Sequence, residues 1–229
     1  LPSGTVAIGH TRWATHGAPT DQNSHPHVAD RVAIVHNGII ENHGALREEL
    51  PGVEFSSETD SEVAAHLLRR ELDGGADLLA AMRTVVGRLE GAFTLVAVDA
   101  LDPERIVAAR RNSPLVVGVG EGEYFLASDV AAFIAYTRDA VELGQDQIVE
   151  LTRDGVSVTT FDGGPAETTE IHVDWDLEAA QKQGYDWFMR KEIFEQPRAV
   201  ADTLLGRLNE RGDLILDEIR ISPEILRRI

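Results

Sequence analysis

The chain has 229 residues, 43% of them hydrophobic, which is enough to bury the core of one large domain or of one domain with part of another. Its formal net charge is −18, which argues against nucleic acid as a partner, because phosphate contacts need clustered Lys and Arg. No apolar run approaches the roughly 18 residues of a membrane span, and no signal peptide is visible. The sequence has no cysteine, which excludes disulfides and thiolate metal sites and indicates a cytoplasmic protein.

The first 42 residues are rich in His, Gly and Asn and predict two short strands, at residues 6–8 and 32–35. Asn37-Gly38 is a strong hairpin signal. The following "IIENHGALREEL" does not alternate, however, and its apolar spacing favours a helix. We therefore expect Asn37-Gly38 to lie where a strand ends, without a returning partner strand.

Two helices are predicted next. Thr59 and Glu62 have the spacing of a capping box, and the helix that they introduce ends at Gly74-Gly75. The segment "ADLLAAMRTVVGRL" predicts a second helix of similar length.

From Gly91 the apolar period changes to two, and six short strands follow with turn residues between them. Their close spacing leaves no room for crossover helices, so we expect mostly antiparallel pairing. One short helix is expected at residues 129–136. Helices followed by strands, several apolar on both faces, predict an α+β fold in which helices sandwich the sheets.

The pattern changes again after Phe161. Residues 162–184 are polar and acidic and predict a linker, and a helical stripe returns over residues 185–208. Since the chain stops at Ile229 within this pattern, we expect the last segment to be the start of a second domain.

Three clusters, at residues 9–17, 23–38 and 57–60, carry side chains suited to binding a small polar molecule. They supply a fixed cation, hydroxyls, an aromatic ring, an amide beside a free backbone N–H, and a carboxylate: Arg12, Thr11 and Thr15, Trp13, Asn37 with Gly38, and Asp60. A cation with hydroxyls suits a carboxylate ligand, and a separate carboxylate suits an ammonium group. Together they describe a pocket for a free α-amino acid, and the amide with its neighbouring N–H suits a developing oxyanion.

Each of these residues also has a simpler interpretation. Arg12 could form a surface ion pair, Trp13 could pack in a core, and Asp60 could only stabilise a helix N-terminus. Asn37-Gly38 could be a structural turn. His25 and His27 lack a third ligand of clear spacing, so no metal site is predicted.

The motifs "GHTRWATHG", "HPHV", "VHNGIIENH", "SETDSEVAAHLL", "SPLVVG" and "ASD" resemble, in order and spacing, the glutaminase domain of the glutamine–fructose-6-phosphate aminotransferases. "FMRKEIFEQPRAV" resembles the segment that joins this domain to the isomerase domain of those enzymes. The "RWATHG" and "VHNGIIEN" forms favour this family over the amidophosphoribosyltransferases and asparagine synthetases.

The resemblance implies a four-layer αββα sandwich of the N-terminal-nucleophile hydrolase type. It implies hydrolysis of glutamine to glutamate and ammonia, with transfer of the ammonia to fructose 6-phosphate and no cofactor. Residues 1–177 would be the glutaminase domain, and residues 178–229 the linker and the start of a sugar-phosphate isomerase domain. The full-length enzyme would be a cytoplasmic homodimer.

The resemblance also implies residue roles. Arg12, Thr15 and His16 would hold the glutamine α-carboxylate. Asp60 and the Gly38 carbonyl would hold its α-amino group, and the Asn37 amide with the Gly38 N–H would form the oxyanion hole. Trp13 would belong to a loop that closes over glutamine, and His25 would brace that loop.

The family's nucleophile is an N-terminal cysteine, and this sequence contains none. We therefore expect the chain to be a glutaminase domain truncated at its N-terminus and inactive as it stands. Two alternatives remain: a non-catalytic glutamine-binding or regulatory module, and the glutaminase domain of another class II amidotransferase, such as the amidophosphoribosyltransferase type.

Overall fold

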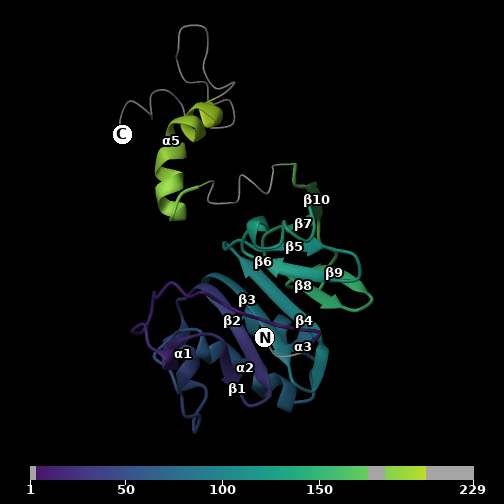
Figure 1. Ribbon diagram of the computed structural model, residues 1–229. Helices are drawn as coiled ribbons and strands as arrows, with labels where there is room; N and C mark the ends of the chain where they lie inside the picture. The colour runs from purple at the N-terminus through teal and green to yellow at the C-terminus, as the bar shows by residue number, and fades with distance from the viewer. Residues whose placement is uncertain (1–3, 175–183, 205–229) are drawn as a thin grey trace, which may run out of the picture. The chain divides into compact units, whose positions relative to one another are not determined.

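Two antiparallel sheets form the body of the first part of the chain. The computed structural model describes residues 4–174 and 184–204, and the chain divides into two compact units, Leu1–Asp174 and Trp175–Ile229. In the first unit, a six-stranded sheet has the order β1-β2-β3-β4-β8-β9 and a four-stranded sheet has the order β10-β7-β5-β6 (Figure 1). The predictions of an α+β fold and of antiparallel pairing are confirmed.

The strands are short and follow one another closely along the chain. Their bounds are β1 (His27–Ala29), β2 (Val32–Ile40), β3 (Gly91–Asp99), β4 (Asp102–Arg111), β5 (Val116–Val119), β6 (Tyr124–Ala127), β7 (Asp139–Leu143), β8 (Gln147–Thr152), β9 (Gly155–Thr160) and β10 (Thr168–His172).

Three α-helices precede β3, and two 3₁₀ turns lie in the loops. The bounds are η1 (Asp21–Asn23), α1 (His43–Glu48), α2 (Glu62–Asp73), α3 (Leu78–Val86) and η2 (Val130–Ala132). The two predicted helices correspond to α2 and α3. At the start of α3 the Asp77 carboxylate accepts a hydrogen bond from the Ala80 N–H at 2.8 Å and so caps the helix. No described side chain caps α2 in this way.

The predicted capping box at α2 is wrong. Ser61 is the N-cap residue and makes no side-chain cap bond. The Glu62 carboxylate instead accepts from the backbone N–H groups of Ser56 and Ser57, each at 2.7 Å, and from both of their hydroxyls. Glu62 therefore fixes the turn that leads into the helix rather than the first helical turn.

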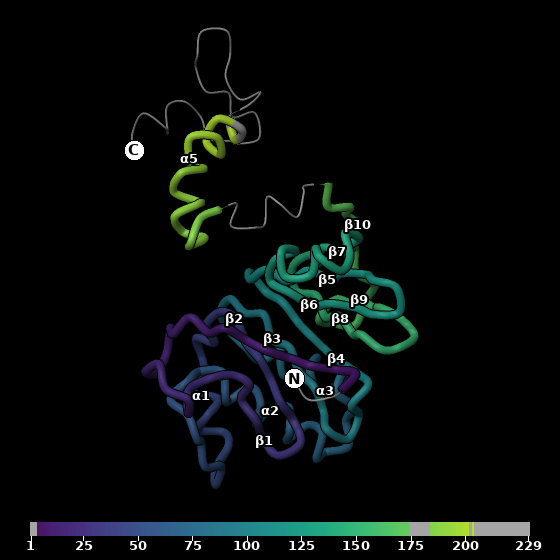
Figure 2. The backbone as a smooth tube through the Cα atoms, in the orientation of Figure 1, coloured from purple at the N-terminus to yellow at the C-terminus, as the bar shows by residue number. Residues whose placement is uncertain are grey.

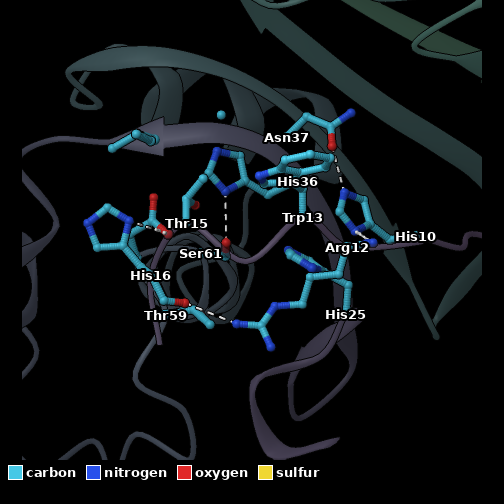
Figure 3. Close-up of a pocket in the computed structure, with 13 residues that line it drawn as sticks. His10, Arg12, Trp13, Thr15, His16, His25, His36, Asn37, Thr59 and Ser61 are labelled. Atoms are coloured by element: carbon cyan, nitrogen blue, oxygen red, sulfur yellow. Dashed lines mark hydrogen bonds and ion pairs between the residues drawn. The ribbon is translucent and has the colours of Figure 1, made fainter. Parts of the chain in front are cut away.

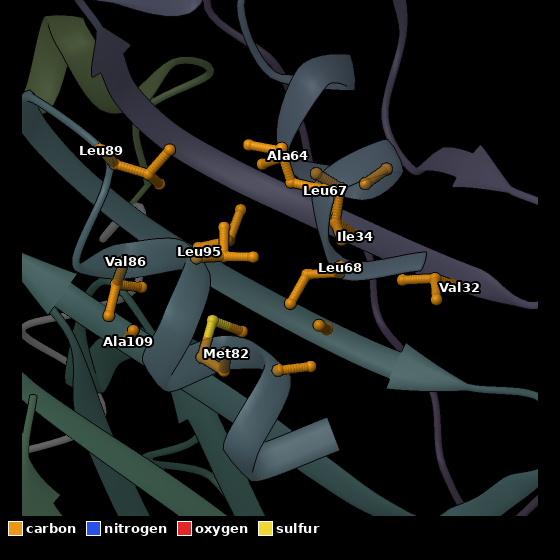
Figure 4. Close-up of a cluster of buried hydrophobic side chains, with 14 of the residues drawn as sticks. Val32, Ile34, Ala64, Leu67, Leu68, Met82, Val86, Leu89, Leu95 and Ala109 are labelled. Carbon is orange, nitrogen blue, oxygen red and sulfur yellow. The ribbon is translucent and has the colours of Figure 1, made fainter. Parts of the chain in front are cut away.

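The main core lies between the helices and one face of the six-stranded sheet (Figure 4). Leu67 and Leu68 of α2 and Met82 of α3 are fully buried there against Ile34 and Leu95 of the sheet. A second apolar cluster, which includes Ala108, Leu143 and Val149, fills the space between the two sheets. The first unit is thus layered as helices, sheet, sheet.

The helix that the sequence predicts next to the four-stranded sheet does not form. The predicted helix at residues 129–136 is only the 3₁₀ turn η2, followed by a turn from which Phe133 packs on Val116 and Ala140. The Asp129 carboxylate accepts from the Ala131 N–H and so favours a tight turn.

Three strand predictions are also wrong. Residues 6–8 are extended, with alternate residues half-buried, but they form no strand because none of the described strands pairs with them; Figure 2 shows the segment's path. β2 continues through Asn37-Gly38 to Ile40, pairing with β3 as far as Ile40 opposite Gly91. The expected linker after Phe161 contains β10, which completes the edge of the four-stranded sheet beside β7.

In the second unit, the described residues form one helix, α5 (Phe188–Leu204), within the predicted helical stripe. The rest of that stripe lies outside the described residues. Several apolar side chains of this segment, including Trp187, Met189 and Phe194, are exposed. The predicted identities of the two domains stay predictions.

Among the described residues, no helix is both long enough and apolar enough to cross a membrane.

Candidate active site

A cavity of about 340 Å³ lies where the end of β2 meets the start of α2 and the loop before β1 (Figure 3). Eight of the residues predicted to bind or process a ligand line it: Arg12, Trp13, Thr15, His16, His25, Asn37, Gly38 and Asp60. Thr11, whose hydroxyl was also a candidate, is not among its lining residues. The eight residues come from stretches up to 48 positions apart in the sequence, so the fold is what brings them together. Their individual roles stay predictions.

Gly38 has a backbone conformation that a side chain would not tolerate. Its φ is +116°, and a Cβ atom would lie 2.0 Å from the Ala92 carbonyl oxygen of β3. Only glycine therefore lets β2 stay paired with β3 at this point. The Asn-Gly pair is not a hairpin turn here, since both residues lie within the ladder.

The polar backbone groups of Gly38 lie on the edge of β2 that faces away from β3. The Ile40 N–H binds the Asp60 carboxylate, whereas the Glu41 N–H binds the Glu90 carbonyl on the β3 side. Since backbone groups alternate in direction along an antiparallel strand, the N–H and C=O of Gly38 share the edge used by Ile40. β1 pairs only with residues 32–34, so it does not cover that edge at Gly38.

Asp60 is buried, and the two oxygens of its carboxylate have different neighbours. Its Oδ2 accepts from the Ile40 N–H at 2.7 Å, and its Oδ1 lies 3.9 Å from His16 Nδ1. The carboxylate thus contacts a neighbouring strand rather than the N–H groups of the helix that follows it. This geometry disfavours the interpretation of Asp60 as a helix-terminal charge alone.

The Arg12 side chain closes its own loop. Its guanidinium donates to the carbonyl oxygens of His16, Gly17 and Ala18 at 3.0 to 3.2 Å. It forms no ion pair with a described carboxylate, so the surface ion-pair interpretation receives no support. Arg12 itself has φ +53°, which turns the chain sharply at this position.

Trp13 and Thr15 lie on the rim of the cavity. Trp13 is 89% exposed, which is inconsistent with packing in a core. A large ring held in water beside a cavity suits a residue that covers a ligand.

Two histidines at the cavity are held in their neutral form. Burial lowers the pKa of His25 to about 3 and the pKa of His36 to about 4. His36 Nδ1 lies 2.8 Å from the Ser61 hydroxyl, while His36 Nε2 has no partner among the described residues. The His25 ring packs on those of His10 and His27, with centroids 4.3 and 4.6 Å away.

The loop before β1 and the segment that leads into α2 are joined by partly buried hydrogen bonds. Asn23 donates to the Ala18 carbonyl and to the Glu58 carboxylate, and it accepts from the Glu58 N–H. Burial would raise the pKa of Glu62, but the hydrogen bonds from Ser57 and Ser56 outweigh it and lower that pKa to about 2. An ionised Glu62 therefore anchors the segment that carries Asp60.

Five lining residues were not predicted: His10, His36, Ile39, Thr59 and Ser61. His10 lies two positions before Arg12, and His36 directly precedes Asn37. His10 could have been predicted from its spacing, because residues two positions apart in an extended segment point to the same side and Arg12 was already a candidate. For His36, the buried run before it suggested only a strand.

Within the described residues, no group of three or more His, Asp or Glu side chains is arranged to hold a metal ion. The cavity instead combines a buried carboxylate, neutral imidazoles, an amide and free strand-edge backbone. Such a set can bind a zwitterion and donate hydrogen bonds to a polarised carbonyl oxygen.

Residues 10–135 match the family profile described as the glutamine amidotransferase domain, and they make up more than half of the chain. The chain belongs to the glutamine amidotransferase family. The matched range includes every residue that lines the cavity.

Curated relatives show which members of this family the chain is similar to. Over its whole length the chain is 68% identical to the glutamine–fructose-6-phosphate aminotransferase (isomerizing) of Streptomyces coelicolor and 58% identical to that of Corynebacterium diphtheriae. It covers 38% of the length of each of these relatives. The resemblance predicted from the motifs is thereby confirmed.

Solved structures support the fold assignment. A structure titled the allosteric regulatory enzyme of purine biosynthesis is 25% identical, with a TM-score of 0.57, over 66% of this chain and 34% of its own. The glutamine phosphoribosylpyrophosphate amidotransferase of Bacillus subtilis is 23% identical, with a TM-score of 0.54 and the same coverage. The likeness shows that the chain shares the fold of these two enzymes.

Proposed function

We propose that this chain is the glutamine-hydrolysing part of an enzyme that makes glucosamine 6-phosphate from fructose 6-phosphate and glutamine. The observation that carries the proposal is one cavity that combines a buried carboxylate, an Asn side chain and the free strand edge at Gly38. The names of the relatives at 58% and 68% identity supply the acceptor sugar.

The substrate's two charged groups would be bound from opposite elements. Asp60 Oδ1 and the Gly38 carbonyl would receive the α-ammonium group of glutamine. The loop of Arg12, Thr15 and His16 would receive the α-carboxylate. For Arg12 this requires an exchange or sharing of hydrogen bonds, since its guanidinium donates to three loop carbonyls.

The amide of the substrate would then extend toward the end of β2. The Asn37 Nδ2 and the Gly38 N–H would donate to the oxygen of its carbonyl as negative charge develops there. Trp13 would cover the bound glutamine, and His25 would brace the loop through its contact with His10. Acyl transfer needs a nucleophile, and the family's cysteine is not in this sequence.

The wider assignment follows from the same resemblance. We propose a four-layer αββα sandwich of the N-terminal-nucleophile type for the complete glutaminase domain, comprising residues 1–177 of this chain. Residues 178–229 would lead into a sugar-phosphate isomerase domain. The whole enzyme would be a cytoplasmic homodimer that uses no cofactor.

Calorimetric titration of the 229-residue chain with L-glutamate and L-glutamine tests the binding part. We expect saturable binding of both and a strong loss of it in Asp60→Asn. No binding of either amino acid would contradict the proposal.

An ammonia-release assay tests the catalytic part. The 229-residue chain should release no ammonia from glutamine above the buffer rate, and the full-length enzyme should release it. Binding to the chain without glutaminase activity in the full-length protein would instead favour a non-catalytic glutamine-binding module.

A further inference from the structure

His10 lies between the backbone of the Arg12 loop and the Asn37 side chain. The Arg12 N–H donates to His10 Nδ1 at 2.9 Å, and His10 Nε2 lies 2.6 Å from Asn37 Oδ1 (Figure 3). The two ring nitrogens therefore connect the loop of residues 9–18 to the end of β2.

The hydrogen bond from the Arg12 N–H determines which ring nitrogen of His10 carries the proton, and therefore the direction of the hydrogen bond to Asn37. A backbone N–H can only donate, so His10 Nδ1 must be the acceptor and carries no proton. The ring's proton is then on Nε2, and Nε2–H donates to Asn37. The Asn37 atom that accepts can only be its oxygen, which leaves both hydrogens of its Nδ2 free.

An asparagine side chain is nearly symmetric in shape, so packing alone does not decide which way its amide points. Here the Arg12 N–H fixes the tautomer of the His10 imidazole, and this tautomer fixes the orientation of the Asn37 amide. The surroundings hold that imidazole in place. The His25 ring packs against it at 4.3 Å, and the Arg12 guanidinium closes the loop on three carbonyl oxygens.

We propose that His10 is a positioning residue for amide hydrolysis: it holds the Asn37 oxygen so that the Asn37 NH₂ group faces the carbonyl oxygen of the substrate. This inference rests on the proposed function of the cavity. The reversed amide would present its own oxygen to the developing negative charge, which would remove a donor and add a repulsion.

Two substitutions of equal size separate this role from simple packing. In His10→Gln the side-chain amide can still donate to Asn37 Oδ1. In His10→Glu an ionised carboxylate can only accept, and it would draw the Asn37 NH₂ group toward itself. We expect His10→Gln to keep the kcat of the full-length glutaminase within about tenfold of wild type.

His10→Glu should lower kcat by roughly 10² to 10³, the usual effect of losing one oxyanion donor. The KM for glutamine should stay within about threefold in both variants, because the side chains proposed to bind the ammonium and carboxylate groups, Asp60 and Arg12, are retained. The exposed His172→Gln is the matched surface control and should leave both constants unchanged. Equal kcat values for His10→Gln and His10→Glu, or a change confined to KM, would overturn the assignment.

A melting curve accompanies each variant. If His10→Glu does not fold, His10→Leu replaces it. This variant removes the donor without adding charge, and it should still have a kcat at least tenfold below that of His10→Gln. A kcat for His10→Leu equal to that of His10→Gln would mean that no hydrogen bond from position 10 matters.

The tautomer can be observed without any activity. In a long-range ¹H–¹⁵N NMR spectrum of the 229-residue chain near neutral pH, His10 should show an unprotonated Nδ1 and a protonated Nε2. The opposite tautomer, or a doubly protonated ring, would contradict the inference whatever the enzyme does. Conversely, a full-length wild-type protein that releases no ammonia would refute the proposed function and leave this tautomer result intact.

Discussion

The two halves of strand β2 differ in what they contact and in how completely their polar groups are paired. Val32 and Ile34 in the first half are fully buried against α2, in a cluster made only of apolar side chains. His36, Asn37 and Gly38 in the second half line the cavity, and His36 Nε2 has no partner among the described residues. One strand thus supplies stability at its start and unused hydrogen-bonding capacity at its end.

This difference has a physical cause. Apolar burial is non-directional and rewards close packing, whereas a binding site must leave donors and acceptors unpaired until its ligand arrives. Substitutions in the two halves should therefore be separable by measurement: those in the first should change the free energy of unfolding, and those in the second should change ligand binding or turnover.

The largest expected effect is in the apolar cluster that the first half of β2 shares with α2. Leu67→Ala on α2 removes a fully buried side chain from the cluster that covers Ile34. We expect it to lower the free energy of unfolding by about 2 to 5 kcal/mol, through lost burial and the cavity left behind. Urea unfolding measures this, and glutamate affinity at a temperature where the variant is folded should be unchanged. A large loss of affinity in the folded variant would show that the two regions are coupled.

Asn37 tests the polar half. In the full-length enzyme, Asn37→Ala and Asn37→Asp should lower glutaminase kcat by roughly 10² to 10³, or about 3 to 4 kcal/mol, because one donor to the oxyanion is lost. Melting temperature and the KM for glutamine should change little. Steady-state kinetics beside a melting curve check this, and a wild-type kcat in Asn37→Ala would leave Asn37 with only a structural part in the strand.

Acid should lower the stability of the fold through two histidines at the cavity: the buried His36 in the second half of β2 and the half-buried His25 in the loop before β1. The folded pKa values of His25 and His36 are lowered to about 3 and about 4 from 6.5, so between these values and pH 6.5 the unfolded chain binds protons that the folded chain does not. Stability is therefore present above pH 6.5 and is lost as the pH falls toward 4, by up to about 1.4 kcal/mol per pH unit for His36.

Urea unfolding at pH 7, 6, 5 and 4.5 measures this slope, and His36→Gln should flatten it. Below pH 4.5 the protonation of Glu62, whose folded pKa is about 2, should add a further loss, because stabilisation by a carboxylate of lowered pKa disappears as the pH falls. A stability that does not depend on pH between 7 and 4.5 would show that folding does not lower the pKa values of these histidines.

Asp60→Asn should have the smallest effect on stability and still a clear effect on binding. The asparagine oxygen can keep the hydrogen bond from the Ile40 N–H, so the free energy of unfolding should change by less than about 1 kcal/mol. Loss of the charge that faces the cavity should raise the glutamine KM at least about tenfold. Asp60→Ala is the matched comparison, because it also leaves the Ile40 N–H without its acceptor and should cost more stability. Reduced stability with unchanged glutamine kinetics in Asp60→Asn would mean that Asp60 is only structural.

The sequence predicted the elements that have strong local periodicity. Helices α2 and α3 and most strands from β3 onward follow from apolar spacing and turn residues. β7 and β10 were missed because β7 is partly and β10 mostly exposed, so neither has a clear apolar pattern. They form strands because β7 pairs with β5 and β10 pairs with β7. The end of β2 was misjudged because the residues after Gly38 do not alternate and fit a helix, whereas β2 stays paired with β3 through Ile40. The glycine of the Asn-Gly pair is needed here for the close approach of Ala92 and not for a turn.

The site was predictable in composition and only partly in geometry. The residue types indicated an amino-acid pocket, and the family resemblance selected the eight residues that the cavity unites. Contacts such as that of Asp60 with Ile40, or of His10 with Asn37, join residues 20 and 27 positions apart. Neither follows from local spacing, because each depends on how the loop and the helix entry meet the end of β2.

The restriction at Gly38 also bears on how such a pocket can diversify. Any side chain at this position would push β2 away from β3, and the same backbone borders the cavity, so a mutation there would alter the fold and the pocket together. Few substitutions at Gly38 could therefore change the ligand without disrupting the sheet. The side chains of Trp13 and Thr15 are exposed and meet no such constraint, so changes in substrate preference should accumulate at these two positions while the strand end stays the same.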